Sequence, residues 1–243
     1  MSGTVAVVGA GPGLGAAVAR RFAKEGFNVA LLARNPETLT PVEAEVRRAA
    51  GTAAQPGRVI ALACDATDQA SVTDVFRRMR ASLGATSALV YNAGAFQRAG
   101  LLNLNASQFE EAWRINCLGA LLCAQQVLPD MVQANRGSIL LSGATASLRG
   151  GALFASLAVG KFGLRALAQS MAREFGPQGI HVAHIVIDGQ IDSARTRSYS
   201  APGRAAATFL QPDALAEQYW QLHCQDPTAW TLELDVRPAV EKF

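Results

Sequence analysis

Seven short apolar runs, separated by helical patterns, constrain the fold of this 243-residue chain more than any other feature of its sequence. The runs are rich in β-branched and apolar residues, as buried strands are. Because parallel neighbours need a long return path, the alternation predicts parallel strands joined by crossover helices, with the sheet buried on both faces. The runs read TVAVVG, NVALLA, VIALAC, ALVY, SILLS, HVAHIVI and WTLEL.

The first run leads into a glycine-rich loop, GAGPGLG, which opens directly into a helical pattern. Glycine lets the backbone turn sharply and approach a pyrophosphate, while free N–H groups and the positive end of the helix attract the anion. A tight strand-to-helix turn without a ligand is the alternative. In this context we predict a dinucleotide site in an α/β fold, a Rossmann-type doubly wound parallel sheet of about seven strands with helices on both faces. The candidate contacts are Gly9, Gly11, Gly13 and Gly15.

Residues 1–243 are expected to form a single dinucleotide-binding domain. The length is near the upper end of what one hydrophobic core supports, and 50% of the residues are apolar. One long irregular segment, about 187–210, follows the sixth predicted strand. Because long loops inside a compact domain are usually lids or binding loops, we expect this segment to cover the substrate.

The end of the second run indicates which dinucleotide is bound. Ala33 and Arg34 stand where such a fold holds the adenosine ribose. An acidic residue there would bind the ribose 2′-hydroxyl, whereas an arginine fork can hold a 2′-phosphate. Arg34 therefore favours NADP(H) over NAD(H), the alternative being an exposed loop arginine.

Charge and hydropathy argue against several other partners. The net charge of +3 and the pI of about 8.8 are mild, and the arginines are scattered along helices, so neither nucleic acid nor a membrane surface is predicted as a partner. The N-terminal run reads as a buried strand and not as a signal peptide, and no apolar run approaches the ~20 residues of a membrane span.

Cysteines and histidines give no sign of a disulfide framework or a metal site. The cysteines lack CxxC spacing, which favours packed, reduced thiols in a cytoplasmic protein. His181 and His184 are three residues apart in a strand and therefore point to opposite faces, so no metal is predicted. The cysteines are Cys64, Cys117, Cys123 and Cys224.

Six segments stand in a specific order along the chain. They are the glycine loop Gly9 to Gly15, Asp65 in ACDAT, Asn92-Ala93-Gly94, Asn116 in RINCLGA, Lys161, and Gly189-Gln190-Ile191-Asp192-Ser193. In this order and spacing, over nearly the whole chain, the sequence resembles the short-chain dehydrogenase/reductase family.

The resemblance implies a role for each segment. Asp65 would bind the adenine amino group, and the Asn92–Gly94 turn would support the central sheet. Lys161 would bind the nicotinamide ribose, whose hydroxyls can satisfy its N–H donors. Gly189 and Ile191 would lie along the nicotinamide. Asn116 and Lys161 would be two of the four familiar active-site residues.

The other two familiar groups are missing. The family usually has a tyrosine four residues before the lysine, as proton donor to the carbonyl oxygen, and a serine thirteen residues before that tyrosine. These positions hold Leu157 and Ala144. A shift in the turn could bring in a nearby hydroxyl, for which Ser142 is a candidate. Without a positioned acid the rate falls on the order of 10²–10⁴-fold, so the standard reduction should be severely impaired.

Tyr199 is a second candidate proton donor, because it lies in the segment expected to cover the nicotinamide. A lid tyrosine could complete the site on closure. The alternative is an exposed loop tyrosine without a role.

Two functions remain open from the sequence. The leading one is an NADP(H)-dependent oxidoreductase of short-chain dehydrogenase/reductase type that transfers a hydride to or from a small carbonyl or activated alkene, with a non-standard proton donor. The alternative is a non-catalytic dinucleotide-binding pseudoenzyme that acts as a sensor or partner subunit. In this family the helix that carries the lysine commonly forms a subunit interface, so a homo-dimer or homo-tetramer is expected in either case.

Overall fold

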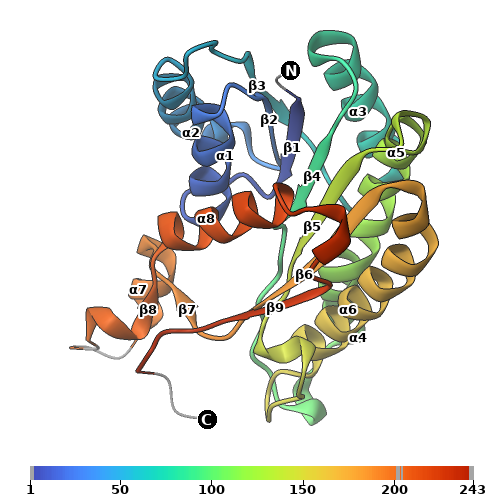
Figure 1. The fold of residues 1–243 in the computed structure, drawn as a ribbon. Helices are drawn as coiled ribbons and strands as arrows, with labels where there is room; N and C mark the ends of the chain where they lie inside the picture. The colour runs from blue at the N-terminus through green and yellow to red at the C-terminus, as the bar shows by residue number, and fades with distance from the viewer. Residues whose placement is uncertain (1–2, 201–202, 204, 241–243) are drawn as a thin grey trace.

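The computed structural model describes residues 3–200, 203 and 205–240, and it is built around a seven-stranded parallel sheet (Figure 1). The strand order is β3-β2-β1-β4-β5-β6-β9. The crossover between the two halves lies next to β1, where the order reverses, and this confirms the predicted doubly wound α/β fold. The strands are β1 (Thr4–Val8), β2 (Asn28–Ala33), β3 (Val59–Ala63), β4 (Ala88–Tyr91), β5 (Gly137–Ser142), β6 (Ile180–Ile187) and β9 (Glu233–Val236).

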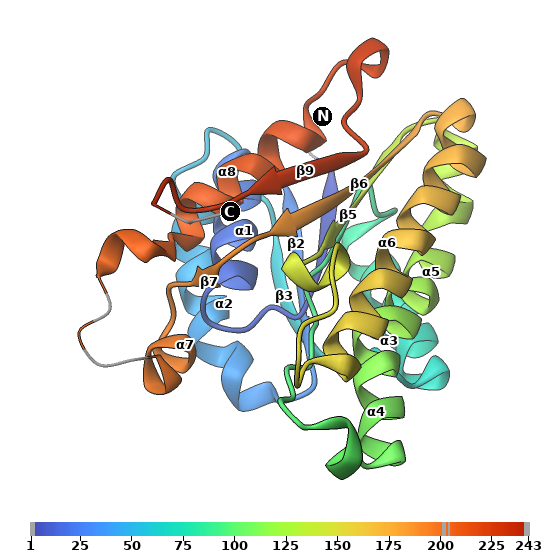
Figure 2. The ribbon, with the colours of Figure 1, turned by 90° about the horizontal axis from the view of Figure 1, so that it is seen from below.

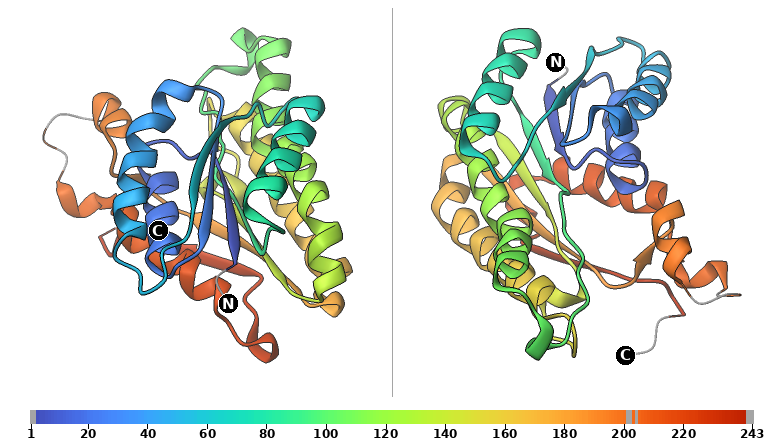
Figure 3. Two further views of the ribbon diagram at one scale, coloured as in Figure 1. Left: turned by 90° about the horizontal axis from the view of Figure 1, so that it is seen from above. Right: turned by 180° about the vertical axis from the view of Figure 1, so that it is seen from behind.

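Helices cover both faces of the sheet, as the views in Figures 2 and 3 show. Each face has its own buried apolar cluster between sheet and helices, which explains why the strand sequences are apolar throughout. On one face lie α1 (Leu14–Lys24), α2 (Pro36–Ala50) and α8 (Pro212–His223). On the other lie α3 (Gln69–Leu83), α4 (Ala106–Trp113), α5 (Gly119–Ala134) and α6 (Ala155–Phe175).

Side-chain caps fix where α2 and α3 begin, but α1, which follows the glycine loop, has no such cap. The Asn35 side chain accepts from the Glu37 N–H at 2.9 Å and begins α2, and Asp68 accepts from Ala70 and Ser71 to begin α3. The helix α1 differs because its N-cap is Gly13, which has no side chain to satisfy the first N–H groups. The Ala16 N–H donates to the Gly11 carbonyl at 3.1 Å, and the N–H groups before it are left for a ligand.

The predicted covering segment has more structure than its sequence suggested. Between residues 187 and 210 the chain forms β7 (Gln190–Ile191), the short helix α7 (Ala194–Tyr199) and β8 (Phe209–Leu210), and β7 pairs with β8. Ser193 begins α7 by accepting from the Thr196 N–H at 3.1 Å. Residues 201, 202 and 204 of this segment lie outside the described residues.

The last strand begins later than predicted. The apolar run starts at Trp230, but β9 covers Glu233–Val236 and pairs with β6. Trp230 instead stacks on His181, with ring centroids 4.9 Å apart, and its indole N–H donates to the Gln225 carbonyl at 3.3 Å. A ring contact therefore holds this residue outside the ladder.

The long predicted helix is interrupted once. Between α4 and α5, Arg114–Leu118 form a single π-helical turn, η2. By length and composition alone, the run Ala106–Ala134 is the one stretch among the described residues that could cross a membrane, with a mean hydropathy of 1.3. Half of its most apolar window is buried inside the structure, as in the core helix of a globular protein.

Candidate functional site

One cavity of about 1110 Å³ lies at the carboxyl ends of the parallel strands. In doubly wound sheets, ligands bind at this edge, where the strand order reverses. The cavity brings together every site residue proposed from the sequence. These are Gly9, Gly11, Gly13, Gly15, Arg34, Asp65, Asn92, Gly94, Asn116, Ser142, Lys161, Gly189, Ile191 and Tyr199.

The glycine loop is shaped by close backbone approach. Gly9 has φ +85°, and a Cβ there would lie 2.5 Å from the Ala93 nitrogen. A Cβ on Gly15 would lie 2.3 Å from the Gly9 carbonyl oxygen, so the helix could not begin so close to the strand with any larger residue. At Gly11, by contrast, no described atom beyond the residue's own chain neighbours lies within 4 Å of the same position. The loop therefore presents bare backbone to the cavity at Gly11.

At the far end of the cavity lie two polar side chains with capacity for a ligand. Arg34 follows β2, is exposed, and forms no hydrogen bond or ion pair with any described residue. Asp65 follows β3, and one of its oxygens accepts from both the N–H and the hydroxyl of Thr67, at 2.9 and 2.8 Å. Its second oxygen has no described partner.

Two asparagines fix the centre of the cleft. The Asn92 amide donates to the Gly9 carbonyl at 3.0 Å and ties the turn after β4 to the glycine loop. Asn116 is fully buried in the π-helical turn η2. Its amide nitrogen donates to the carbonyls of Ala95 and Ala112, at 3.0 and 2.9 Å, and its oxygen accepts from the Ala95 N–H at 3.3 Å. The Asn116 side chain is therefore held rigidly beside the cavity.

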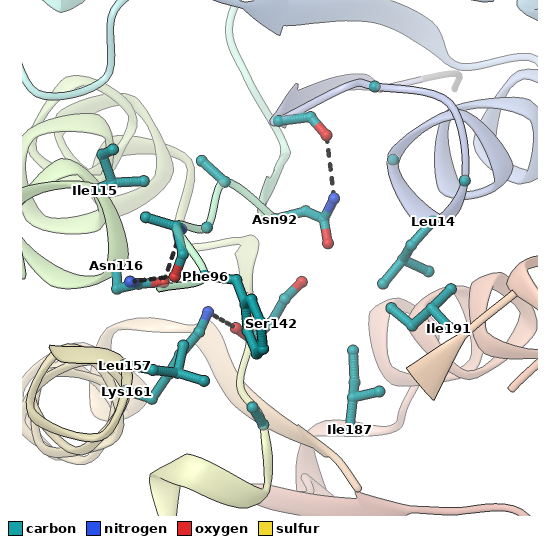
Figure 4. A pocket seen from close by; sticks show the side chains of 18 of the residues that line it. Leu14, Asn92, Phe96, Ile115, Asn116, Ser142, Leu157, Lys161, Ile187 and Ile191 are labelled. Atoms are coloured by element: carbon teal, nitrogen blue, oxygen red, sulfur yellow. Dashed lines mark hydrogen bonds between the residues drawn. The ribbon is translucent and has the colours of Figure 1, made fainter. Parts of the chain in front are cut away.

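Lys161 projects from α6 into the cleft, as Figure 4 shows. Only 6% of the residue is exposed, and its Nζ donates to the Ser142 carbonyl at 2.7 Å. The ammonium has no further hydrogen-bond partner among the described residues. Burial lowers the pKa of this amine from its ordinary 10.5 to about 8. The cleft therefore contains an amine that can gain or lose a proton near neutral pH.

Apolar side chains occupy the two positions at which the sequence predicts the family's tyrosine and serine. Leu157 and Ala144 both line the cavity, and Figure 4 shows Leu157 beside Lys161. Neither can donate a proton. The nearby Ser142 hydroxyl lies 2.6 Å from the Tyr219 hydroxyl, in the buried layer under α8. Tyr219 therefore holds this hydroxyl, and the role of Ser142 as a replacement donor stays a prediction.

Tyr199 lies at the end of α7, on the outer side of the cavity. Its ring stacks on Phe96, with centroids 5.9 Å apart and planes 8° from parallel, and the residue is 49% exposed. At the other end of α7, the Ser193 Cβ lies 3.6 Å from where a Gly13 Cβ would be. The helix thus spans the cleft from the glycine loop to Phe96.

A polar cluster that sequence reasoning missed lies on the cavity wall. The Thr145 hydroxyl donates to the Asp188 carboxylate, which also pairs with Arg237 at 3.4 Å. The sequence signal was a single acidic residue, Asp188, directly after the apolar strand β6 and before Gly189. Asp188 pairs with Arg237 only in the folded chain. Because Arg237 is distant in sequence, the sequence alone could not connect the two residues.

A buried histidine lies behind the wall of the cavity. His184 is fully buried in β6, and its two ring nitrogens are the only buried side-chain polar atoms without a partner among the described residues. Burial, with a further contribution from the Lys161 charge, lowers its pKa to about 4, so the ring is neutral at physiological pH. Its Nε2 occupies the space where a Cβ on Gly143 would be, at 2.3 Å.

The cleft, with its glycine loop, its buried lysine and its parallel sheet, is that of a dinucleotide-binding oxidoreductase. The chain belongs to the short-chain dehydrogenase family, whose profile matches residues 3–203. It is 33% identical over 174 residues, 70% of this chain and 66% of the relative, to a short-chain type dehydrogenase/reductase of Sinorhizobium fredii. It is 30% identical over 197 residues, 81% of this chain and 79% of the relative, to a 3-oxoacyl-[acyl-carrier-protein] reductase of Bos taurus.

Solved structures agree with this assignment. A short-chain dehydrogenase from Rhodopseudomonas palustris is 39% identical and superposes with a TM-score of 0.81, covering 97% of this chain and 98% of that one. A metagenomic short-chain oxidoreductase in complex with NADP is 28% identical, with a TM-score of 0.82 and 99% of each chain covered. Members of this family bind a nicotinamide dinucleotide and act on small molecules.

Proposed function

We propose that this chain is an NADP(H)-dependent oxidoreductase that moves a hydride to or from a small carbonyl or activated alkene, with Lys161 in place of the usual proton donor. The observation that carries the proposal is the Lys161 amine, which is almost fully buried, lines the same cavity as the glycine loop, and has a pKa of about 8. General acids work best when their pKa lies near the operating pH.

The residues of the cleft fit a bound NADP(H). The uncapped start of α1 and the bare backbone at Gly11 suit a pyrophosphate, and the unpaired Arg34 suits a 2′-phosphate. The free oxygen of Asp65 can accept from an adenine amino group. When bound, the nicotinamide supplies or takes up the hydride.

The proton step belongs to Lys161. In the direction of reduction, its ammonium gives one proton to the carbonyl oxygen as the hydride reaches the carbonyl carbon, which leaves a neutral amine and an alcohol. The amine then regains a proton from solvent. The bond to the Ser142 carbonyl holds the amine in place, and its other N–H donors serve the ribose and the substrate. Asn116 positions the wall beside the amine through its bonds to Ala95.

The test is NADPH oxidation by the purified chain with 9,10-phenanthrenequinone, an aldehyde and an enal as acceptors, across pH 6 to 10. Because the acid must be protonated, the rate of reduction should fall about tenfold per pH unit above roughly pH 8, the value to which burial lowers the pKa of Lys161. A rate that stays flat to pH 10 would contradict this assignment.

Leu157 and Ala144 favour a second candidate, a non-catalytic dinucleotide-binding protein that acts as a sensor or partner subunit. Both side chains are apolar and line the cavity at the positions of the usual polar pair. This candidate predicts NADPH binding with no oxidation of the cofactor by any acceptor at any pH. Nicotinamide fluorescence measured beside the turnover assay separates the two functions.

Self-association through α6 is part of the proposal. Val159 and Phe162 are exposed on the same helix that carries Lys161, at 45% and 42%. Two large apolar side chains on one open helix face suit a subunit contact, in line with a homo-dimer or homo-tetramer. The free cysteines fit a cytoplasmic location. Light scattering on the wild type and on Phe162→Asp tests the contact, since the variant should shift to a smaller species.

A further inference from the structure

The apolar wall of the cavity continues outward onto the surface along two loops. The ring of Phe96 lies 5.6 Å from that of Phe154, and both residues line the cavity. Beyond them the two loops are joined by a backbone bond from the Ala99 N–H to the Leu153 carbonyl, at 2.9 Å. Leu153 itself is exposed. The wall therefore passes from the inside of the cavity to its outer edge without a polar break at these residues.

Two leucines extend this surface further. Leu101 and Leu102 lie in the short helix η1 (Leu101–Asn103), and they are 78% and 100% exposed. The preceding Gly100 connects them to the wall, because a Cβ at that position would lie 3.6 Å from the Leu153 side chain. Phe96, Leu101, Leu102, Leu153 and Phe154 are together called the apolar rim. Contiguous exposed apolar surface of this kind marks a binding site.

Three arginines surround the same opening. Arg149 and Arg195 line the cavity, and Arg98 stands next to Ala99 in the rim loop. Within the part of the chain that the structure describes, none of their side chains forms an ion pair or hydrogen bond. Several arginines elsewhere on the surface are paired, as Arg20 is with Glu45 and Asp213. Unpaired cations around an opening raise the local concentration of anions.

We infer that the substrate is an elongated apolar carbonyl compound of the acyl-chain class, with an anionic group at the end that stays at the opening. Leu157 and Ala144 make the inner wall apolar, the apolar rim continues it, and the arginines match the charge. The reacting carbonyl lies at Lys161 and the chain runs out past Phe154 to Leu153. This inference rests on the proposed function for the reaction at Lys161, but binding of the chain is independent of turnover.

The experiment is isothermal titration calorimetry of the full chain, with and without saturating NADP⁺, using three probes. Dodecanoate has chain and anion, 1-dodecanol has the chain alone, and butanoate has the anion with a short chain. Dodecanoate should bind at least about a hundredfold more tightly than butanoate, because each buried methylene adds to affinity, and about tenfold more tightly than dodecanol. A fourth titration with dodecanoyl-coenzyme A identifies the source of the anion: tighter binding than dodecanoate points to an acyl thioester, and equal or weaker binding points to a free acid.

Variants separate the two parts of the site. Arg149→Gln should weaken dodecanoate about tenfold and leave dodecanol unchanged, whereas Arg48→Gln, an exposed and unpaired arginine on α2, should change neither. Leu153→Asp should weaken the binding of both chain-bearing probes, whereas Leu153→Met should bind both about as tightly as the wild type. NADP⁺ titrations on the same samples report the proposed function separately.

Two results would overturn the inference. One is affinity that does not depend on chain length, whether or not NADP⁺ binds. The other is a Leu153→Asp variant that changes the oligomeric state in light scattering but leaves the binding of dodecanoate intact. The second result would assign the apolar rim to a contact with a second copy of the chain.

Discussion

The two ends of the cleft are built on different principles. At the dinucleotide end, the contacts come from bare backbone and from polar groups without partners, such as Gly11, Arg34 and one oxygen of Asp65. At the substrate end, Leu157 and Ala144 line the same cavity as a single buried amine, Lys161. One end offers groups suited to a cofactor, while the other keeps Asn116 and Lys161 and has apolar side chains at the two positions where the sequence predicts the family's tyrosine and serine.

The difference is that backbone defines the dinucleotide end, whereas side chains define the substrate end. Backbone geometry in the glycine loop is fixed by close contacts such as that between Gly15 and Gly9, so it tolerates little change. A side chain on the inner face of α6 can be exchanged without disturbing the strand order. Substrate chemistry can therefore be redefined at Leu157 while the dinucleotide end stays intact.

The largest effect is expected from a variant that removes the Lys161 amine from the substrate end. Lys161→Met should lower turnover by about 10²–10⁴-fold, because the positioned acid is lost. The same change should stabilise the fold at neutral pH, since burial lowers the lysine pKa to about 8 and the folded chain therefore holds its proton less tightly than the unfolded chain.

The stability effect of Lys161 has a definite dependence on pH. Between about pH 8 and the ordinary value of 10.5, the unfolded chain keeps the lysine proton while the folded chain releases it. The wild-type free energy of unfolding should therefore gain a contribution that rises with pH through this window, and Lys161→Met should lack it. Urea titrations at pH 7 and pH 10 measure this, and identical slopes with pH in both proteins would contradict it.

Arg34→Ala sharpens the description of the dinucleotide end. If Arg34 holds the 2′-phosphate, the variant should bind NADPH more weakly by about 1.5–3 kcal/mol while NADH binding barely changes. Fluorescence titration with each cofactor measures the two affinities. Equal losses for both cofactors would mean that Arg34 acts elsewhere on the dinucleotide.

The substrate end can be tested by restoring the family's usual pair. Leu157→Tyr with Ala144→Ser should raise reduction of 9,10-phenanthrenequinone by at least about tenfold, since a phenol beside Lys161 provides a second acid. Dinucleotide affinity serves as the control and should not change. If the rate stays the same, the walls of the cavity, and not the missing hydroxyls, limit the reaction.

The smallest effect is expected at Tyr199. Its hydroxyl forms no described hydrogen bond, so Tyr199→Phe should change the free energy of unfolding by less than about 0.5 kcal/mol and leave turnover unchanged. Tyr199→Ala, which removes the stack on Phe96, should weaken substrate binding more than it lowers the maximal rate. A clear loss of rate in Tyr199→Phe would instead assign proton donation to the phenol.

The sheet and the dinucleotide end could be predicted from the sequence because their signals are local. Strand periodicity and glycine spacing depend on neighbours in the chain, and α2 and α3 begin at the capping residues that precede their patterns. The start of β9 was the exception, since Trp230 leaves the strand for a ring contact with His181, which is distant in sequence and meets it only in the fold.

The substrate end could not be predicted in the same way, because its parts meet only in three dimensions. Ser142 was a plausible donor by spacing, but its hydroxyl is held by Tyr219 from α8. The pairing of Asp188 with Arg237 and the joining of the Leu153 and Ala99 loops likewise connect distant segments. Each of these contacts depends on packing between elements and leaves no periodic signal.

The π-helical turn at Asn116 has a consequence for how the chain can change in length. A π turn holds one residue more than the α-helical turn it replaces, so η2 reads as a one-residue insertion absorbed within a single turn. Deleting Cys117 would let α4 and α5 merge into one regular helix. Every side chain on one side of the deletion would then rotate by roughly 100° relative to the other, and Asn116 could not keep its bonds to Ala95 while α5 kept its packing. A single-residue deletion in η2 would therefore disturb the cavity wall and the packing of α5 together.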